Sequence, residues 1–301
     1  MKFSIPVDIP KAAQGTYLQN FDTMTFGTGR LFLFAGDQKA EHLNADFYGE
    51  GIAPEDGSPE HLFQIAGKAK IGAFASQLGL LARYAGDYPA VRYIVKMNSK
   101  THLVKSTQKD PVSLLWNDLD QVLSFKKNSG LNIVGVGYTI YPGSEYESQM
   151  LAEAARLVYE AHQAGLVAVV WSYARGKAVV NEKDPHLVAG TAGLVACMGA
   201  DFVKVNPPKA EGMTQAEALK EAVQAAGRTK VICAGGGSMG AKEFLQSLHD
   251  QIHIAGCAGN ATGRNIHQKS PEDAVRFCNA IHAITVEEKS VDEAMRIYTT
   301  E

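Results

Sequence analysis

Residues 199–208, GADFVKVNPP, form a short apolar run that is interrupted by one lysine, Lys204. Alternation along an extended strand places Phe202, Lys204 and Asn206 on the same face. Similar apolar runs lie before and after this one, and the segments between them have helical periodicity. We therefore interpret the run as one strand of a sheet in which strands and helices alternate.

Eight apolar runs are expected to be strands, and the segments between them place apolar residues at i, i+3 and i+4, which predicts helices. Eight alternating units favour an α/β fold of the closed (β/α)8 type, the TIM barrel, over a doubly wound open sheet with a similar alternation. The strand predictions are 31–35, 71–76, 91–97, 133–138, 167–173, 201–206, 230–234 and 252–257, and the helix predictions include 147–162, 185–198, 214–226 and 241–248.

Residues 1–301 are expected to form a single barrel domain, because no Pro/Ser-rich linker or abrupt change of composition divides the chain. About 30 residues precede the first strand as an N-terminal extension with a short predicted helix. The stretch 48–59, YGEGIAPEDGSP, is predicted to be an acidic, Gly/Pro-rich loop. Both segments are interpreted as additions around the barrel.

The formal net charge of -3 provides no overall field to attract nucleic acid or an anionic membrane. No signal peptide and no uninterrupted apolar run long enough to span a bilayer is visible, so a cytoplasmic location is expected. The four cysteines follow no metal-ligand spacing and are interpreted as free, structural thiols.

Lys96 and Lys204 lie toward the carboxyl ends of predicted strands, the end of the barrel at which chemistry belongs. Burial of the Lys204 ammonium would favour the neutral amine, the nucleophile needed to attack a ketone. From the residues alone two alternatives remain: the Lys204 side chain points outward, or it pairs with a carboxylate. Lys96, in VKMNSKT at the end of the third strand, is a rival that we rank below Lys204.

The fifth predicted strand reads VVWSYARG and places Trp171, Tyr173 and Arg175 on one face beside the Lys204 strand. Tyr173 can shuttle a proton to an enamine, and a neighbouring cation would stabilise its ionised form. Arg175 requires a carboxylate or phosphate partner. Ordinary core packing is the stronger interpretation of Trp171 when it is taken alone.

The first strand ends in FAGDQKAEH, which places Asp37 at its carboxyl end with Glu41 and His42 close behind. Asp37 can hold the Lys204 amine in position or transfer protons, although an aspartate at such a turn can also cap backbone amides. For Glu41 and His42 an ordinary loop role is the stronger interpretation.

The last two strands lead into glycine-rich loops, AGGGSMG at 234–240 and AGNATGRNIHQ at 258–268. Glycines let backbone amides approach a phosphate closely, and Arg264 can form a bidentate contact with it. Loops after strands seven and eight are the usual phosphate site of such barrels. A phosphate-bearing ligand is therefore expected here.

With these motifs, the sequence resembles the archaeal-type class I fructose-bisphosphate aldolases of the DeoC/LacD-like aldolase superfamily. DQKAEH at 37–42 is similar to a D-H-G-x-E-H-like segment, WSYARG at 171–176 to W-x-Y-P-R-G, and GADFVKV to the strand with the Schiff-base lysine. GGGS and GRNIHQ look like the phosphate loops of that family. Departures from its pattern include Gln38, Lys39, Ala174 and the segment 206–208, which line the expected substrate mouth.

The resemblance implies Lys204 as the Schiff-base lysine, Tyr173 as acid and base, and Asp37 as a helper, with no metal or other cofactor. It implies cleavage or formation of a phosphorylated ketose, such as fructose 1,6-bisphosphate, in glycolysis or gluconeogenesis by a homo-oligomer. The alternatives are a transaldol- or thiolase-like transferase acting on another keto sugar phosphate and a non-catalytic barrel that binds sugar phosphate. The residues expected around the substrate and its phosphate are Trp171, Arg175, Gly236, Gly237, Ser238, Gly263 and Arg264.

Overall fold

The computed structural model describes residues 4–42, 44–103 and 107–300, and its centre is a closed barrel of eight parallel strands. Each strand pairs with the next one along the chain, and β8 pairs with β1. The prediction of a (β/α)8 barrel is therefore confirmed, because a doubly wound sheet would keep two open edges. The strands are β1 (Leu31–Ala35), β2 (Ala73–Gln77), β3 (Tyr93–Lys96), β4 (Ile133–Ile140), β5 (Val167–Ser172), β6 (Phe202–Val205), β7 (Lys230–Ala234) and β8 (Gly259–Thr262).

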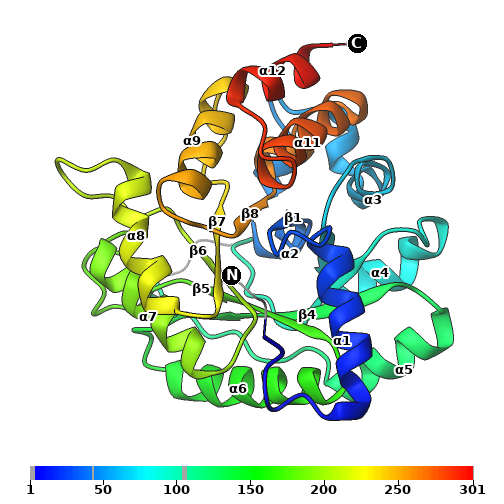
Figure 1. Ribbon diagram of the computed structural model, residues 1–301, viewed down its shortest axis with the longest axis vertical. Coiled ribbons are helices and arrows are strands. Elements are labelled where there is room, and N and C mark those ends of the chain that lie inside the picture. Colours follow the sequence, from blue (N-terminus) through cyan, green and yellow to red (C-terminus); the bar gives the residue numbers. More distant parts are fainter. Residues whose placement is uncertain (1–3, 43, 104–106, 301) are drawn as a thin grey trace.

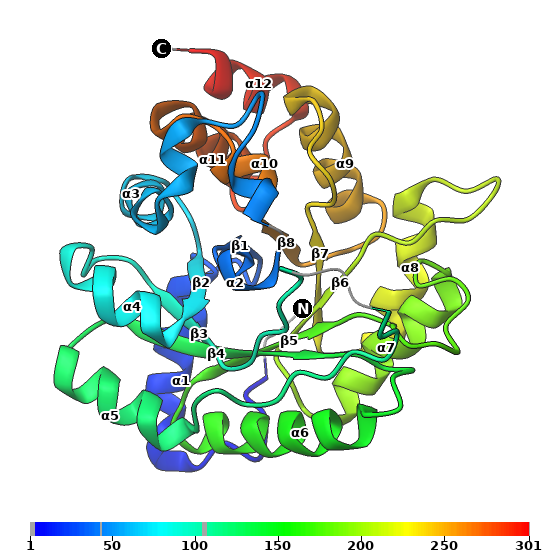
Figure 2. The ribbon, with the colours of Figure 1, turned by 180° about the vertical axis from the view of Figure 1, so that it is seen from behind.

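Helices connect the strands and surround the barrel, as Figures 1 and 2 show from opposite sides. Three short 3-10 helices, η1 (Asn44–Phe47), η2 (Pro54–Gly57) and η3 (Ala85–Asp87), lie in the connections. The α-helices are α1 (Lys11–Met24), α2 (Gln38–Glu41), α3 (Pro59–Lys68), α4 (Leu78–Tyr84), α5 (Leu119–Ser129), α6 (Glu147–Gln163), α7 (Pro185–Cys197), α8 (Gln215–Ala226), α9 (Ala241–His253), α10 (Arg264–His267), α11 (Pro271–Thr285) and α12 (Val291–Thr299).

Local sequence explains where several helices begin. The side chain of Asp184 accepts a hydrogen bond from the backbone N–H of Leu187 at the start of α7. Thr214 and Glu217 form a capping box at the start of α8. Such caps satisfy backbone N–H groups that have no partner within the helix. The predictions 185–198 and 214–226 consequently agree with α7 and α8 to within one residue at each end.

Side chains along the strands alternate between two packed layers. In β1, Leu31 and Leu33 belong to the layer inside the barrel, whereas Phe32 and Phe34 belong to the layer shared with the surrounding helices. In β6, Phe202 belongs to the inner layer, so alternation also turns Lys204 inward. The face predicted for Lys204 is therefore confirmed.

The eighth strand was predicted at the wrong place. Residues 252 and 253 of the predicted run 252–257 end α9, and β8 follows the run at Gly259–Thr262. The sequence of β8, GNAT, lacks the apolar pattern that identified the other strands. Its buried polar side chains pair with one another and with α11, because Thr262 Oγ1 donates to Asn260 Oδ1 at 2.8 Å and Asn260 Nδ2 donates to Thr285 Oγ1 at 3.0 Å. Such pairing lets a polar strand be buried.

The N-terminal extension is more than an addition to the barrel. On α1, Tyr17, Phe21 and Met24 are buried and join the layer of side chains inside the barrel. The hydroxyl of Tyr17 donates to Asp201 at the beginning of β6. Figure 1 shows α1 in front, beside the barrel strands. This helix therefore closes the amino ends of the strands.

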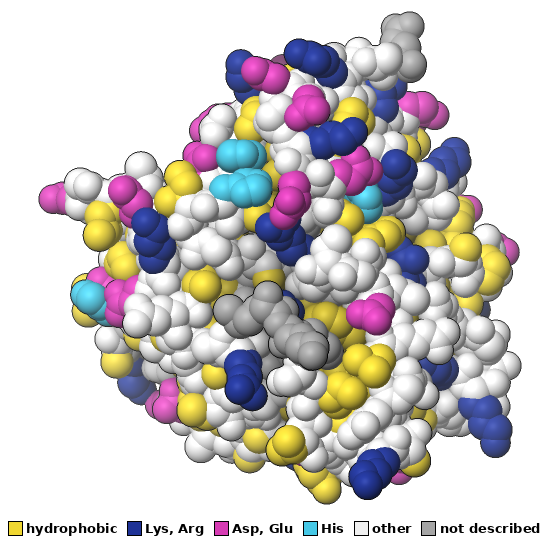
Figure 3. Space-filling view, viewed as in Figure 1, with side chains coloured by type: hydrophobic (Ala, Val, Ile, Leu, Met, Phe, Trp, Pro, Cys, Tyr) yellow, Lys and Arg dark blue, Asp and Glu magenta, His cyan; other side chains and the backbone are white. Residues whose placement is uncertain are grey.

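Charged side chains of both signs are interspersed on the face shown in Figure 3, and hydrophobic side chains form only small groups there. This distribution agrees with the small net charge of -3. Among the described residues, none of the helices has the length and apolar character needed to cross a bilayer.

Candidate active site

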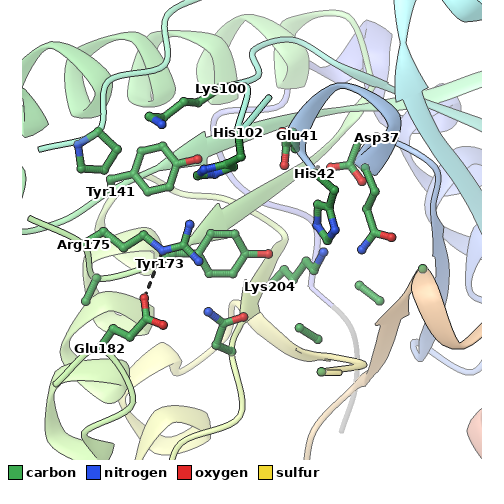
Figure 4. A pocket seen from close by; sticks show the side chains of 18 of the residues that line it. Asp37, Glu41, His42, Lys100, His102, Tyr141, Tyr173, Arg175, Glu182 and Lys204 are labelled. Atoms are coloured by element: carbon green, nitrogen blue, oxygen red, sulfur yellow. Dashed lines mark hydrogen bonds and ion pairs between the residues drawn. The ribbon is translucent and has the colours of Figure 1, made fainter. Parts of the chain in front are cut away.

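A pocket of about 960 Å³ opens at the carboxyl ends of the strands. Active sites of α/β barrels lie at this end, because the loops that follow the strands converge there. The pocket lies within the volume range of small-molecule sites. Figure 4 labels several of the charged and aromatic side chains that line it, namely Asp37, Glu41, His42, Lys100, His102, Tyr141, Tyr173, Arg175, Glu182 and Lys204.

Lys204 lies on β6 in the wall of this pocket, and only 5% of the residue is exposed. Its Nζ atom makes no hydrogen bond or ion pair with any residue in the described part of the chain. Burial lowers the pKa of this amine, and the charges of Asp37 and Glu41 oppose that shift. A lowered pKa increases the fraction of neutral amine, the form that can attack a carbonyl carbon.

The rival lysine, Lys96, has a different environment. Its Nζ atom lies 2.5 Å from Oε1 of Glu41 and also donates to the backbone oxygen of Asn98. Ser99 Oγ donates to the same carboxylate oxygen at 3.1 Å. Glu41 is thus the anionic partner of a buried ammonium, a more specific role than the ordinary loop role that the sequence favoured.

Asp37 lies at the start of the connection that follows β1, lines the pocket and is 1% exposed. Neither carboxylate oxygen has a hydrogen-bond partner among the residues that the structure describes. Burial and the charge of Glu41 raise the pKa of this carboxyl, whereas Lys204 and Lys96 lower it. Asp37 therefore presents two uncommitted oxygens close to the Lys204 amine, and it caps no helix through its side chain.

Tyr173 follows β5, and in Figure 4 its hydroxyl end and the amine end of Lys204 extend into the same part of the pocket. Burial raises the pKa of Tyr173 well above its usual value, and the charges of Asp37 and Glu41 raise it further, while Arg175 lowers it. Arg175 thus favours the ionised form as expected, but burial and the two carboxylates outweigh its effect. The phenol keeps its proton at neutral pH and is suited to donate it.

Arg175 lies at the rim of the pocket, as predicted for a residue at this strand end. Its Nε donates to Glu182 Oε2 at 3.0 Å, a contact drawn in Figure 4. Its guanidinium carbon lies 5.4 Å from the ring centre of Tyr173 and 5.8 Å from that of Tyr141. The carboxylate partner expected for this guanidinium is therefore Glu182, and the guanidinium remains partly exposed to the pocket.

Trp171 is fully buried and does not line the pocket. The amines of Lys96 and Lys204 lie 5.4 and 5.5 Å from its ring centre. The sequence predicted that Trp171 contacts the substrate directly, and the structure corrects this prediction. Alternation along β5 directs the indole into the layer inside the barrel. The ring instead packs near the amines of both lysines.

The glycine-rich loops after β7 and β8 reach the pocket only in part. Gly236, Gly263 and Arg264 line it, with an Arg264 Nη2 contact of 3.2 Å to the backbone oxygen of Gly236. Arg264 Nε is buried without a partner among the described residues. This guanidinium joins the two loops and keeps donor capacity for an anion.

Gly237 and Ser238 lie outside the pocket lining. Ser238 Oγ donates to Gln268 Oε1 at 2.6 Å, and Asn265 Nδ2 donates to the backbone oxygen of Gly237 at 3.0 Å. The two predicted phosphate contacts are not brought to the pocket, because loop-to-loop hydrogen bonds turn these residues toward α10.

Sequence reasoning missed several residues that line the pocket. Lys100 and His102 follow β3, and Tyr141 follows β4. Asn206, which the sequence placed on the same face as Lys204, also lines the pocket. Burial lowers the pKa of His102, and the cations Lys100 and Arg175 lower it further. The rule that residues after strand ends carry chemistry would have found Lys100 and His102, since VKMNSKTH was considered only for Lys96.

His42, assigned an ordinary loop role from the sequence, also lines the pocket, and its Nδ1 lies 2.6 Å from Asp46 Oδ2. Within the described residues, no group of three or more His, Cys, Asp or Glu side chains could hold a metal ion. All four cysteines are free thiols, three of them buried and Cys197 exposed.

Comparison with known proteins identifies relatives over nearly the whole chain. A family model described as DeoC/LacD family aldolase matches residues 31–269. A Methanocaldococcus jannaschii protein named fructose-bisphosphate aldolase/6-deoxy-5-ketofructose 1-phosphate synthase is 58% identical over 294 residues, which cover 98% of this chain and 94% of the relative.

Solved structures agree with this relationship. A fructose-bisphosphate aldolase from Slackia heliotrinireducens is 56% identical with a TM-score of 0.96, covering 99% of this chain and 94% of its own. An archaeal fructose-1,6-bisphosphate aldolase, solved with its catalytic lysine covalently bound to the carbinolamine intermediate, is 31% identical with a TM-score of 0.74, covering 91% and 99%. The chain therefore belongs to the DeoC/LacD family of aldolases and is an enzyme of the class I, Schiff-base type.

Proposed function

We propose that this aldolase cleaves and forms a phosphorylated ketose through an imine on Lys204. The observation that carries the proposal is the contrast between two buried lysines. Lys96 is held by Glu41 at 2.5 Å, whereas the Lys204 amine faces the pocket without an ionic partner. Burial lowers the pKa of Lys204, so this lysine is the better nucleophile.

The neutral Lys204 amine adds to the ketone carbon, and loss of water from the carbinolamine gives an iminium ion. The iminium accepts the electron pair of the neighbouring carbon–carbon bond, which breaks as a base removes the proton of the adjacent hydroxyl group. The carboxylate of Asp37, with both oxygens uncommitted, is suited to this proton transfer. The aldehyde product then leaves an enamine on Lys204.

Tyr173 protonates the enamine carbon and returns the system to an iminium ion, which water hydrolyses to free the ketone and the amine. The raised pKa of the phenol supports its role as the proton donor. Cations and fixed dipoles around the pocket stabilise the charge that develops in the transition states.

Two cationic regions lie at different strands around the pocket, and they support a substrate with two phosphates. Arg264 follows β8, whereas Lys100 follows β3 and Arg175 follows β5. Guanidinium and ammonium groups bind phosphate through charge-assisted hydrogen bonds. Fructose 1,6-bisphosphate, the compound in the names of the relatives, fits this arrangement, with dihydroxyacetone phosphate and glyceraldehyde 3-phosphate as products.

A second candidate is a transaldol transfer, in which the enamine on Lys204 attacks a different aldehyde. The observation that favours it is the double name of the Methanocaldococcus jannaschii relative, which includes 6-deoxy-5-ketofructose 1-phosphate synthase. Both reactions share the imine and differ only in the acceptor. Product analysis with fructose 1,6-bisphosphate, alone and with a second carbonyl compound, separates simple cleavage from transfer.

Borohydride trapping tests the proposal directly. The protein is reduced in the presence of fructose 1,6-bisphosphate or dihydroxyacetone phosphate, and the modified peptide is located by mass spectrometry. We expect an adduct on Lys204 that is absent in Lys204→Met and present in Lys220→Met, which removes an exposed lysine of α8. An adduct on a different lysine, or full activity of Lys204→Met, would contradict the proposal.

A further inference from the structure

Gln38, the first residue of α2, lines the pocket directly against Gly263. A Cβ atom on Gly263 would lie 2.2 Å from Gln38 Oε1 and 2.6 Å from Gln38 Nε2. The side-chain amide of Gln38 therefore fills space that only a glycine leaves free. It lies beside the loop of Arg264, the loop to which the proposed function assigns a phosphate.

His267, at the end of α10, holds one end of this amide. Its Nε2 atom lies 3.0 Å from Gln38 Oε1. The imidazole is completely buried and stacks on Phe47, with ring centres 4.9 Å apart. His61 Nε2 contacts the backbone oxygen of His267 at 2.8 Å. Packing and hydrogen bonds thus fix the orientation of the ring.

Asp56 holds the opposite edge of the same ring. Its Oδ2 atom lies 2.7 Å from His267 Nδ1, and both side chains are completely shielded from solvent. Asp56 belongs to η2, within the stretch 48–59 that the sequence marks only as an acidic loop. Lys39 Nζ anchors η2 by donating to the backbone oxygen of Gly57 at 3.0 Å. Asp56 itself does not line the pocket.

The direction of the hydrogen bonds follows from these contacts. The ring nitrogens of His267 face Asp56 Oδ2 and Gln38 Oε1. An amide oxygen can only accept, so the contact with Gln38 is a hydrogen bond from the Nε2–H of His267 to Oε1. Oε1 of Gln38 is then occupied as an acceptor, and the amide NH₂ group is left for the pocket.

We propose that Gln38 is a specificity-determining residue whose amide N–H donates to a phosphate oxygen of the substrate, with His267 and Asp56 as positioning residues that set the orientation of the amide. This inference rests on the proposed function, since it needs a phosphorylated ketone in the pocket. It extends that function by assigning selection for the phosphate to a neutral side chain that the buried His267–Asp56 pair holds in place.

The test compares variants that distinguish the loss of the Gln38 N–H donor from the loss of its side-chain volume. Gln38→Glu keeps the shape of the side chain but replaces the donor with a carboxylate oxygen, whereas Gln38→Ala removes the side chain. Asp56→Asn removes the carboxylate that contacts His267 Nδ1, and Glu55→Gln makes the same chemical change at the exposed neighbouring residue. The half-saturating concentration for borohydride trapping on Lys204 is measured with dihydroxyacetone phosphate and with unphosphorylated dihydroxyacetone, and thermal unfolding monitors the fold.

We expect Gln38→Glu to raise the half-saturating concentration of dihydroxyacetone phosphate about a hundredfold, because it loses a hydrogen bond to a charged group and places a negative charge beside the phosphate. Gln38→Ala should have a smaller effect, because it removes the donor without adding a negative charge. Asp56→Asn should weaken binding of the phosphorylated compound with little change in the maximal trapping rate, and Glu55→Gln should match the wild type. Dihydroxyacetone should bind all five proteins alike.

A purely structural role of Gln38 predicts the opposite order, with the isosteric Gln38→Glu milder than Gln38→Ala. That order, or an equal effect on both ketones, overturns the inference while trapping in the wild type upholds the proposed function. Absence of any adduct in the wild type overturns the proposed function and, with it, the inference. Should Asp56→Asn not fold, the comparison of the two Gln38 variants decides.

Discussion

The Nζ atom of Lys96 lies 2.5 Å from Oε1 of Glu41, and this buried ion pair separates two lysines that contact the same tryptophan ring. Glu41 is the anionic partner of Lys96, whereas the amine of Lys204 faces the pocket. Two lysines beside the same ring thus have different chemistry because of one carboxylate from α2, the helix that follows β1. The ion pair also has consequences for stability.

Glu41→Ala should destabilise the fold, because it leaves the fully shielded ammonium of Lys96 without its anion. Loss of one partner of a buried pair costs about 3–5 kcal/mol of unfolding free energy. Urea denaturation measures this quantity. The double variant Lys96→Met with Glu41→Ala should recover most of the loss, since it removes the unpaired charge. Equal stability of Glu41→Ala and the wild type would show that the pair contributes nothing.

Tyr173→Phe should lower kcat by about 10²–10⁴-fold, the usual contribution of a general acid. The raised pKa of Tyr173 keeps the phenol protonated, and phenylalanine cannot supply that proton. Borohydride trapping on Lys204 should persist, because imine formation precedes protonation of the enamine. Tyr159→Phe, at an exposed tyrosine of α6, is the matched control. An unchanged kcat in Tyr173→Phe would exclude the phenol as the proton donor.

Asp37→Asn should move the acidic limb of imine formation to lower pH. Burial lowers the pKa of Lys204, and the negative charge of Asp37 raises it again, so removal of that charge lowers the pKa further. The neutral amine then persists at lower pH. The rate of borohydride trapping as a function of pH measures this shift, with Asp22→Asn at an exposed residue of α1 as the control. A shift toward higher pH would contradict the assignment.

Arg264→Met should raise KM for a phosphorylated ketose about tenfold to a hundredfold, the effect of losing a charge-assisted hydrogen bond. Ser238→Ala should change KM little, because Ser238 donates to Gln268 and does not line the pocket. Steady-state kinetics of both variants gives the comparison. A larger effect of Ser238→Ala would restore the phosphate contact that the sequence suggested for this serine.

The amino end of the barrel should contribute stability that depends on pH. Burial lowers the pKa of His162, but hydrogen bonds and charges of Asp201 and Asp8 outweigh it and raise the pKa to about 9. A raised pKa means that the stabilisation is complete below about pH 6.5 and is lost as the pH rises through about 9. The side chain is fully buried, and the difference corresponds to about 3 kcal/mol.

Urea denaturation at pH 6 and at pH 9.5 checks this expectation. The unfolding free energy of the wild type should exceed that of His162→Gln at pH 6, and the difference should shrink at pH 9.5. His186→Gln is the control, because His186 is largely exposed in its contact with Glu221. A difference between wild type and His162→Gln that does not change with pH would exclude the ionised pair.

The sequence by itself determined most strands and several helix ends, because alternation and capping are local properties of neighbouring residues. Strands β1 and β7 agree with their predictions residue for residue. The same local rule turned Lys204 inward. It failed at β8, where Asn260 and Thr262 satisfy their polar groups through contacts that only the folded chain supplies.

Only the tertiary structure decided which residues meet. Glu41 reaches Lys96 across 55 positions of the chain, and Asp56 reaches His267 across 211. Such pairs depend on closure of the barrel and on the path of the loops, which bring distant segments to one end of the strands. Periodicity shows the face of a strand on which a side chain lies. The chemistry of Lys204 depends on how deeply its amine is buried and on the charges near it, and the rest of the folded chain determines both.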